Sequence, residues 1–428
     1  MVKLLVSMVS ALAAVASAAS IGKPNDQLSV DLEKRGLAFD YQHDKIRGVS
    51  LGGWLILEAY MNPSLFKAFG NDPPIDEYHY TKKLGKEEAH KRLNKHWDTW
   101  ITEDDIKHIK DLGLNTVRIP IGYWAFLLKE GDPYVQGQLP YVDRVLGWCR
   151  KHGIKAWVDM HGAPGSQNGF DNSGLANHYD WQKGDNVNLT LNALGQMIGR
   201  YGGGNWSDVV IGVEAVNEPL ASVLNMTQLK QYFWDSYYEL RNISGPSQGA
   251  LFHDGFKPVG YWNDFLTTDQ GAWNVVIDHH NYQIFDAGQL NDTIDQHVQT
   301  ACSLGLQNKK EAHWNVVGEW SAALTDCAYW VNGVGKGARW EGHDGSNYNH
   351  GSCEPYRHIS TWSQEHKENV RKFVEAQFDA YEQGSGWIFW AWKTEDAVDF
   401  DFQKLARAGV IPQPLTLRKY PNQCGYNN

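Results

Sequence analysis

The 428-residue chain lacks a basic surplus, a long apolar run and an internal linker. Its formal charge of −11 argues against a binder of nucleic acid or anionic membranes, because phosphate groups need a basic face. No stretch reaches the roughly 18 apolar residues of a spanning helix, so we expect no membrane span. No Pro-, Ser- or Thr-rich segment divides the chain after its N-terminal region, which predicts one domain. A charged fraction of 21% with 13% aromatics excludes a mostly disordered chain.

The chain has few cysteines, and their number is odd. The chain has five cysteines, so at least one is unpaired if the others form disulfides. Cys149 falls on the apolar face of a predicted helix, and we expect it to be buried and free. The other four lie in the last third of the chain and allow three pairings; they are Cys302, Cys327, Cys353 and Cys424.

The N-terminal region predicts secretion and processing. Lys3 precedes an apolar stretch over residues 4–15 and three small residues, which is typical of a signal peptide over residues 1–18. The polar segment 19–35 ends at Lys34-Arg35, which indicates a propeptide cut by a processing protease. An ordinary pair of basic surface residues is the alternative. With processing, residues 36–428 would form the mature catalytic domain.

Five Asn-X-Ser/Thr triplets are candidates for N-glycosylation in a secreted protein. Such triplets also arise by chance, so the occupancy of each stays open. Each asparagine is expected at the surface; they are Asn188, Asn205, Asn225, Asn242 and Asn291.

Units of a helix followed by a strand recur along the chain. Thr102 starts a capping-box pattern before apolar residues at helical spacing, and Gly113 is a plausible stop. A second helical pattern ends at Gly153. Eight buried strands are expected at residues 46–52, 115–120, 155–160, 209–216, 250–252, 275–279, 315–318 and 386–390. Eight parallel strands in one domain predict a (β/α)8 TIM barrel. The alternative, an open doubly wound sheet, is disfavoured because no Gly-rich phosphate loop follows a strand.

Polar residues follow the predicted strands, where a barrel of this kind builds its active site. Glu218 follows strand four in Asn217-Glu218-Pro219, and Glu319 ends strand seven. Two such carboxylates suit glycoside hydrolysis, in which one donates a proton and the other attacks the sugar. A salt bridge is the alternative for either glutamate alone. The remaining strand ends suit a neutral, polyhydroxylated ligand and supply Glu58, Tyr60, Arg118, His161, Phe170, Asp171, His280, Tyr282, Phe285 and Trp390.

Several motifs together resemble a known family. The chain carries, in order, Arg-Gly-Val-Ser-Leu-Gly-Gly-Trp at 47–54, Asn-Thr-Val-Arg-Ile-Pro-Ile-Gly at 115–122, His-Gly-Ala-Pro-Gly-Ser-Gln-Asn-Gly at 161–169, Asp-His-His-Asn-Tyr-Gln at 278–283 and Gly-Trp-Ile-Phe-Trp-Ala-Trp-Lys-Thr-Glu at 386–395. With the two glutamates, these stretches resemble the (β/α)8 glycoside hydrolases of clan A. More narrowly, the chain is similar to the fungal exo-β-1,3-glucanases of glycoside hydrolase family 5. Two positions depart from that pattern: Asn281 stands where a histidine is common, and Ala391 where a serine is common.

The resemblance implies a fold, an activity and a location. The chain would be a secreted, extracellular or cell-wall glucan 1,3-β-glucosidase that releases glucose from the non-reducing ends of β-1,3-glucans. It would retain the anomeric configuration through a double displacement, and transglucosylation is left open. The enzyme would act as a monomer without a cofactor, in fungal cell-wall glucan metabolism.

The resemblance also implies a role for each site residue. Glu218 would be the proton donor and later the base, and Glu319 the nucleophile. For this division the pKa of Glu218 must lie above that of Glu319, and Arg118 would keep Glu319 ionised. The remaining roles are Asn217 on the sugar 2-hydroxyl, Glu58, Asp171, His161 and His280 on the terminal glucose, Tyr282 on Glu319, Trp390 as a platform followed by a cis peptide bond, and Phe170 with Phe285 as a clamp. The disulfides would be Cys302–Cys424 and Cys327–Cys353.

The same residues also allow other functions. His279 and His280 point to opposite faces of a strand, so they do not easily share one ion, and the sequence has no HExxH or paired-cysteine motif; no metal is expected. Acids at Glu395, Asp396, Asp399 and Asp401 fit a solvated loop better than a Ca²⁺ site. The functional alternatives are an endo-β-1,3- or β-1,6-glucanase, a mannanase, and a non-catalytic glucan-binding barrel. Segments 61–97 and 329–355 are candidate walls that favour an exo-type pocket.

Overall fold

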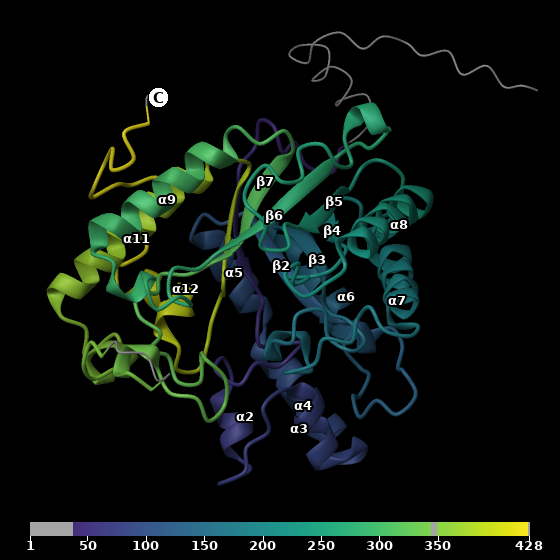
Figure 1. Ribbon diagram of the computed structural model, residues 1–428, viewed down its shortest axis with the longest axis horizontal. Helices are drawn as coiled ribbons and strands as arrows, with labels where there is room; N and C mark the ends of the chain where they lie inside the picture. Colours follow the sequence, from purple (N-terminus) through teal and green to yellow (C-terminus); the bar gives the residue numbers. More distant parts are fainter. Residues whose placement is uncertain (1–36, 344–348, 427–428) are drawn as a thin grey trace, which may run out of the picture. The chain divides into compact units, whose positions relative to one another are not determined.

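The computed structural model describes residues 37–343 and 349–426. The predicted signal peptide (1–18) and propeptide (19–35), with the Lys34-Arg35 processing site, lie outside the described residues. Within them, eight parallel strands close into a barrel in sequence order (Figure 1). The strands are β1 (Ile46–Ser50), β2 (Thr116–Gly122), β3 (Lys155–Gly162), β4 (Val210–Glu214), β5 (Gly249–His253), β6 (Val275–Asn281), β7 (Trp314–Trp320) and β8 (Gly386–Phe389). The predicted (β/α)8 barrel is confirmed.

Helices fill most connections between strands and flank the barrel, with α7 beside α8 and α9 beside α11 (Figure 1). The connection between β5 and β6 holds only a 3-10 turn, Thr268–Gln270. The Thr102 capping box forms as expected, since the Thr102 and Asp105 side chains each accept from the other's backbone N–H. Gly153 ends α6 in the left-handed region, with φ 69°. The helices are α2 (Pro63–Lys67), α3 (Glu77–Leu84), α4 (Lys86–Trp100), α5 (Glu103–Asp111), α6 (Leu139–His152), α7 (Asn186–Tyr201), α8 (Met226–Ser244), α9 (Ile294–Asn308), α10 (Glu354–Arg357), α11 (Gln364–Tyr381) and α12 (Phe402–Arg407).

The inward faces of the strands change character from one end of the barrel to the other. On β3, Trp157, Asp159 and His161 share one face because side chains alternate along a strand. On β6 the same alternation places Val276 and Asp278 on one face. On these two strands the inward face runs from an apolar residue to a polar one, which brings their charged groups to the C-terminal end of the barrel.

The N-terminal end of the barrel is closed by an apolar plug. The plug is a cluster of buried side chains around Tyr41, whose hydroxyl donates to the Ile211 carbonyl at 3.3 Å and accepts from Trp157 Nε1 at 3.1 Å. Gly249 leaves room for the Tyr41 ring, because a Cβ there would lie 3.1 Å from the hydroxyl oxygen. The members of the plug are Tyr41, Ile46, Trp157, Ile211, Leu251, Val276, Val316 and Ile388.

Covalent and surface features follow several expectations. The disulfides Cys302–Cys424 and Cys327–Cys353 are present, and Cys149 is buried and free. All five sequon asparagines are exposed. Across residues 37–343 and 349–426, no helix is both long and apolar enough to cross a membrane.

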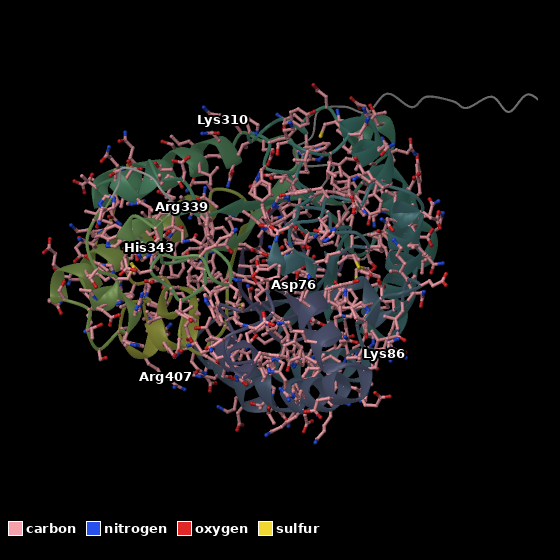
Figure 2. All side chains as sticks on the ribbon, turned by 60° about the horizontal axis from the view of Figure 1, so that its bottom comes forward. Asp76, Lys86, Lys310, Arg339, His343 and Arg407 are labelled. Carbon is pink, nitrogen blue, oxygen red and sulfur yellow. A yellow bond between two sulfur atoms is a disulfide. The ribbon has the colours of Figure 1, made fainter. Side chains whose placement is uncertain are left out.

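Charged side chains differ in their burial. Lys86, Lys310 and Arg407 are exposed, whereas Asp76 is fully buried (Figure 2). Asp76 caps α3 by accepting from the His79 backbone N–H at 2.7 Å, and it accepts from the Ala176 N–H at 2.8 Å. This buried carboxylate therefore holds the loop after β3 against the start of α3.

The acids after β8 do not form the solvated loop that was expected. Asp399 and Asp401 are buried. Asp401 accepts from the backbone N–H groups of Thr394 and Lys404, both at 2.8 Å, and so caps α12. Glu395 accepts from the Ser64 N–H at 2.7 Å. The expectation was wrong because an acid-rich stretch has the same composition in both cases. Its carboxylates can be solvated, or they can be buried as helix caps and loop anchors.

Candidate active site

Arg118 of β2 organises the polar end of the barrel. Its guanidinium is fully buried and donates to Glu319 Oε1 at 2.6 Å and to Asn217 Oδ1 at 2.7 Å. It also pairs with Glu214 at 2.9 Å and with Asp159 at 3.1 Å. Burial alone would lower the pKa of Arg118, but the surrounding carboxylates raise it well above its usual value. One cation thus fixes the ends of β3, β4 and β7 relative to one another.

Glu319 of β7 is held from three sides. Arg118 donates to one oxygen, and the Tyr282 hydroxyl donates to the other at 2.9 Å. The same second oxygen lies 3.5 Å from His280 Nδ1. The contacts expected of Arg118 and Tyr282 are therefore present in the structure.

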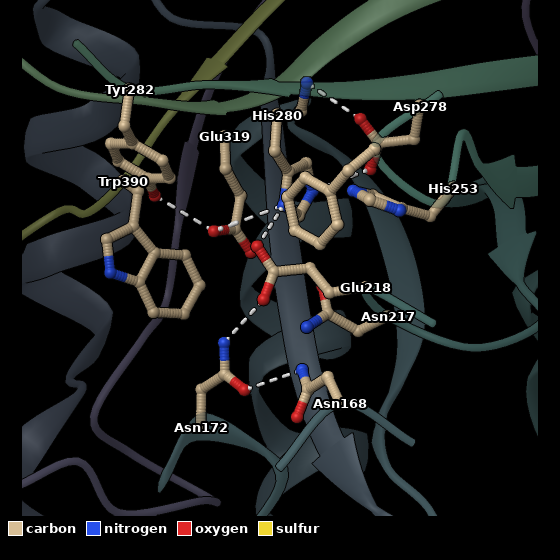
Figure 3. Close-up of polar contacts among 12 residues, drawn as sticks. Asn168, Asn172, Asn217, Glu218, His253, Asp278, His280, Tyr282, Glu319 and Trp390 are labelled. Atoms are coloured by element: carbon tan, nitrogen blue, oxygen red, sulfur yellow. Dashed lines mark hydrogen bonds and ion pairs between the residues drawn. The ribbon is translucent and has the colours of Figure 1, made fainter. Parts of the chain in front are cut away.

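Glu218 lies four residues beyond β4 in an uncommon backbone conformation. Its φ is +45° although it is not a glycine, a feature that clusters at functional sites. Its Oε1 is 2.8 Å from His280 Nδ1, and its Oε2 accepts from Asn172 Nδ2 at 2.6 Å (Figure 3). Glu218 and Glu319 therefore meet at one imidazole nitrogen.

The protonation of the two glutamates differs from the expectation. Burial raises the pKa of Glu218, but its hydrogen bond to His280 and the charge of that histidine outweigh burial and bring the pKa to about 2. Burial raises the pKa of Glu319, against the opposing charges of His280 and Arg118. The expected order of the two pKa values was wrong for this ligand-free site. The expectation included Arg118 beside Glu319 but no cation beside Glu218.

His280 carries the proton in this arrangement. Burial lowers its pKa, but Glu319, Asp278 and the hydrogen bonds raise it well above the usual value. Nδ1 contacts Glu218, and Nε2 lies 3.3 Å from Asp278 Oδ2. Asp278 is fixed in turn by the Gly318 N–H at 2.8 Å; Gly318 leaves the space, since a Cβ there would lie 2.1 Å from the carboxylate.

Three predicted ligand-binding residues carry buried polar atoms with no hydrogen-bond partner among the described residues. These atoms are Glu58 Oε1, His161 Nε2 and Asn217 Nδ2. The pKa of Glu58 is raised well above its usual value by burial and then by Asp171 and Glu319, so its carboxyl is near Asp171 and able to donate. Unpaired buried polar atoms are costly, and a ligand rich in hydroxyls would satisfy them.

Aromatic rings line the same end of the barrel. Trp390 precedes a cis peptide bond to Ala391, as expected, and its Nε1 donates to the Tyr60 hydroxyl. The His161 ring lies parallel to Trp390, with centroids 5.4 Å apart. His161 is held by Asp159, whose Oδ2 is 2.6 Å from its Nδ1. Trp390 is thus fixed as a flat surface within the site.

The two phenylalanines expected to form a clamp are exposed, but they lie in separate ring contacts. Phe285 is 45% exposed and contacts Tyr282 edge-on at 5.5 Å. Phe170 is 39% exposed and contacts Phe256 edge-on at 6.5 Å. Phe256 was missed by the sequence analysis because it lies in a loop beyond β5. The clamp itself remains a prediction.

Sequence reasoning also missed polar residues that hold the site together. Asn172, which donates to Glu218, lies in a loop with no distinguishing motif. His253 ends β5, the strand with the weakest sequence signal, and is fully buried. Asp159, Glu214 and Asp278 are charged residues within otherwise apolar strands, and that contrast could have identified them.

His279 and His280 point to different surroundings, as expected. His279 lies between Asp254 and Glu311, at 2.7 and 2.8 Å. Among the residues that the structure describes, two groups are close enough in principle to hold a metal ion: Glu218 with His253 and His280, and Glu214 with Asp278 and His280. Both share His280, whose two nitrogens already contact carboxylates, so neither group offers a free imidazole lone pair there. The absence of a metal requirement remains a prediction.

The two candidate wall segments contact each other. Segment 61–97 forms α2, α3 and most of α4. The Lys67 ammonium lies 4.1 Å from the centroid of the Tyr329 ring, which belongs to segment 329–355. The Cys327–Cys353 disulfide links a residue just before that second segment to a residue near its end. Residues 344–348 lie outside the described part. Lys336 is close enough to lower the pKa of Asp171, against the larger effect of burial.

Comparisons with known proteins agree with this geometry. Residues 81–328 match the cellulase family, glycosyl hydrolase family 5. The chain is 55% identical over 406 residues to a glucan 1,3-beta-glucosidase of Candida oleophila, across 93% of this chain and 96% of that protein. It is 47% identical over 418 residues to glucan 1,3-beta-glucosidase I/II of Saccharomyces cerevisiae, across 94% and 93%. The rutinosidase of Aspergillus niger shares the fold, with a TM-score of 0.69 at 18% identity over 87% of this chain and 99% of that one.

Proposed function

The chain belongs to glycosyl hydrolase family 5, and on that premise we propose that it is an exo-acting glucan 1,3-β-glucosidase. It removes glucose from the non-reducing ends of β-1,3-glucans and retains the anomeric configuration. The linkage follows the names of the relatives at 47–55% identity. No cofactor takes part in the proposed reaction.

One observation carries the retaining mechanism. Glu218 Oε1 and Glu319 Oε2 flank His280 Nδ1 at 2.8 and 3.5 Å. The two carboxylate oxygens are therefore no farther apart than the sum of those two distances. That sum is below roughly 6.5 Å, the smallest carboxylate separation of inverting enzymes. This close approach supports direct attack by one carboxylate over attack by a water held between sugar and base.

The proposed roles follow from what each glutamate contacts. Glu319, oriented by Arg118 and Tyr282, attacks C1 while Glu218 protonates the glycosidic oxygen. The C–O bond breaks, and its electron pair stays on the leaving oxygen. Glu218 then takes a proton from water, which cleaves the glucosyl–Glu319 ester and releases β-glucose. The same ester could pass glucose to another sugar, which is transglucosylation.

The low pKa of Glu218 is compatible with this role because its proton is stored next to it. In the ligand-free site, His280 is charged and Glu218 is ionised, across a 2.8 Å contact. Shifting that proton to Glu218 gives a neutral pair with the same total charge. A bound sugar displaces water and disfavours separated charges, so binding favours the form in which Glu218 is the acid.

Several groups support binding of the terminal glucose. Glu58, His161, Asp171 and Asn217 offer hydroxyl partners, three of them with the unpaired atoms described above, and Trp390 offers a flat face. The contact between Lys67 and Tyr329 joins the two wall segments and favours a blocked end. Exo action is the consequence, because a chain can then enter only by its terminus.

We also propose that the protein is secreted and acts on wall glucan as a monomer. The support is the N-terminal signal pattern, the dibasic site at Lys34-Arg35, five exposed sequons and two disulfides, which persist in oxidising compartments. Mass spectrometry of the secreted protein should find Gly36 as the first residue.

Product analysis on laminarin tests the function. We expect glucose as the sole early product, released as the β-anomer in proton NMR before mutarotation. Early longer oligomers would contradict exo action, and early α-glucose would contradict retention. Pustulan, a β-1,6-glucan, is the control for linkage; faster hydrolysis of pustulan would overturn the β-1,3 assignment.

A further inference from the structure

His253, the last residue of β5, lies against the proton-carrying pair but has no role in the steps above. It is fully buried, and its ring meets the His280 ring edge-on, with centroids 4.3 Å apart and planes at 76°. Figure 3 shows the His253 ring pointing toward His280 and Glu218. One nitrogen from each histidine and one oxygen of Glu218 lie within 4.8 Å of one another.

The hydrogen of the His253 ring is placed by its backbone neighbour. The Gly255 N–H donates to His253 Nδ1 at 3.0 Å, so Nδ1 must be the acceptor and a neutral ring carries its hydrogen on Nε2. Burial, together with the charge of His280, lowers the pKa of His253 to about 3. The ring is therefore neutral wherever His280 is charged, and its Nε2–H is a fixed donor.

That donor has no partner among the described residues. A buried, unsatisfied N–H destabilises the folded protein, and such a group calls for an explanation, which a catalytic role supplies. Asp254 lies on the Nδ1 side of the ring at 3.7 Å, and Glu218 is a second carboxylate whose charge acts on His253. The Glu218 carboxylate re-forms when the proton passes to the glycosidic oxygen. A neutral N–H turned toward that carboxylate would stabilise it without competing for the proton.

We infer that His253 is a positioning residue for acid catalysis: its ring holds the plane of His280, and its Nε2–H supports Glu218 as the proton leaves. The inference rests on the proposed function. It predicts that replacing His253 lowers the rate most for substrates whose leaving group needs a proton.

Two substrates separate this role from a structural one. Cleavage of laminaribiose expels a glucose hydroxyl, which needs the proton, whereas cleavage of 2,4-dinitrophenyl β-glucoside expels a stable dinitrophenolate, which leaves unaided. The quantity to compare is kcat/KM, since it reports the steps up to the glucosyl-enzyme. His253→Phe keeps a ring against His280 but removes the N–H. We expect its kcat/KM to fall about tenfold on laminaribiose and less than about twofold on the aryl glucoside, because general acid catalysis is worth ~10²–10⁴-fold in full.

A second variant and a matched control complete the test. His253→Gln returns a side-chain N–H donor and should recover part of the loss on laminaribiose. His297→Phe removes another buried histidine with a lowered pKa, on α9, and should change both substrates equally or not at all. Equal losses on both substrates for His253→Phe and His253→Gln would overturn the inference, as would no loss. A wild-type enzyme that cleaves the aryl glucoside but not laminaribiose would instead overturn the proposed function, and the inference with it.

Discussion

The two ends of this barrel are built from the same eight strands but satisfy their side chains differently. At the N-terminal end, the Tyr41 hydroxyl and Trp157 Nε1 hydrogen-bond within the apolar plug. At the C-terminal end, Glu58 Oε1, His161 Nε2 and Asn217 Nδ2 are buried without partners among the described residues. The plug is therefore complete as it stands, whereas the catalytic end is complete only with a ligand.

This difference assigns stability and activity to separate ends. A closed, neutral plug can be packed for stability alone. A catalytic end must keep unpaired donors and like charges close together, and Arg118 and His280 offset part of that cost. Replacing groups that act on the substrate should thus lower activity and spare stability, and replacing groups of the plug should do the reverse. Arg118 is the exception, because it holds the catalytic end together and its removal should lower stability. The predictions below test this division from the largest expected effect downward.

Glu319→Gln should abolish activity with little effect on folding. An amide cannot act as the nucleophile, so kcat on laminarin should fall by about a thousandfold or more, while the melting temperature stays near that of wild type. Glu382→Gln is the matched control at the other end, where Glu382 pairs with Arg47 at 2.8 and 2.9 Å. A Glu319→Gln enzyme with a normal rate would remove Glu319 from the mechanism.

Arg118→Met should destabilise the protein more than any change at the plug. Removal of the buried cation leaves Asp159 and Glu214 buried without their partner, a loss of about 3–5 kcal/mol. Urea unfolding measures it. Arg47→Met is the control, since its partly exposed pair with Glu382 should contribute about 1 kcal/mol or less. Similar losses for the two variants would show that Arg118 is not the organising charge.

Much of the difference between the two ends of the barrel was predictable from sequence, for physical reasons. Helix stops and apolar strand runs are local signals, so the barrel and the strand-end location of Glu218 and Glu319 could be predicted. The positions of Asn172, Phe256 and His253 could not, because they depend on which loops and strand ends meet in space. The pKa order failed for the same reason: His280 lies far from Glu218 in sequence and reaches it only in the closed barrel.

The pH dependence of stability offers a third test, because His279, next to His280 on β6, is held between two carboxylates. Burial lowers the pKa of His279, but Asp254 and Glu311 raise it to about 10. A pKa raised above the usual 6.5 means that this contribution is complete below about pH 6.5 and lost as the pH rises toward 10. Wild-type stability in urea should therefore fall over that window.

The matched variants for this test are two histidine replacements. His279→Gln should be less stable than wild type at pH 6 and should lack the His279 part of the alkaline decline. His297→Gln is the control, because the pKa of His297 is lowered by burial and the group is neutral across the same window. An alkaline decline that is unchanged in His279→Gln would show that the Asp254–His279–Glu311 contact does not set it.

The smallest effects come from removing one hydroxyl at each end. Tyr41→Phe leaves Trp157 Nε1 without its acceptor and should cost about 1–3 kcal/mol in unfolding free energy, with kcat/KM on laminarin unchanged. Tyr282→Phe removes the 2.9 Å hydrogen bond to Glu319 and should lower kcat/KM about tenfold or more, with stability close to wild type. If Tyr41→Phe lowers activity as much as stability, the plug and the catalytic end are coupled, and the separation of roles fails. A stable and active Tyr41→Phe would instead show that the plug is held by packing of its rings, with the hydroxyl dispensable.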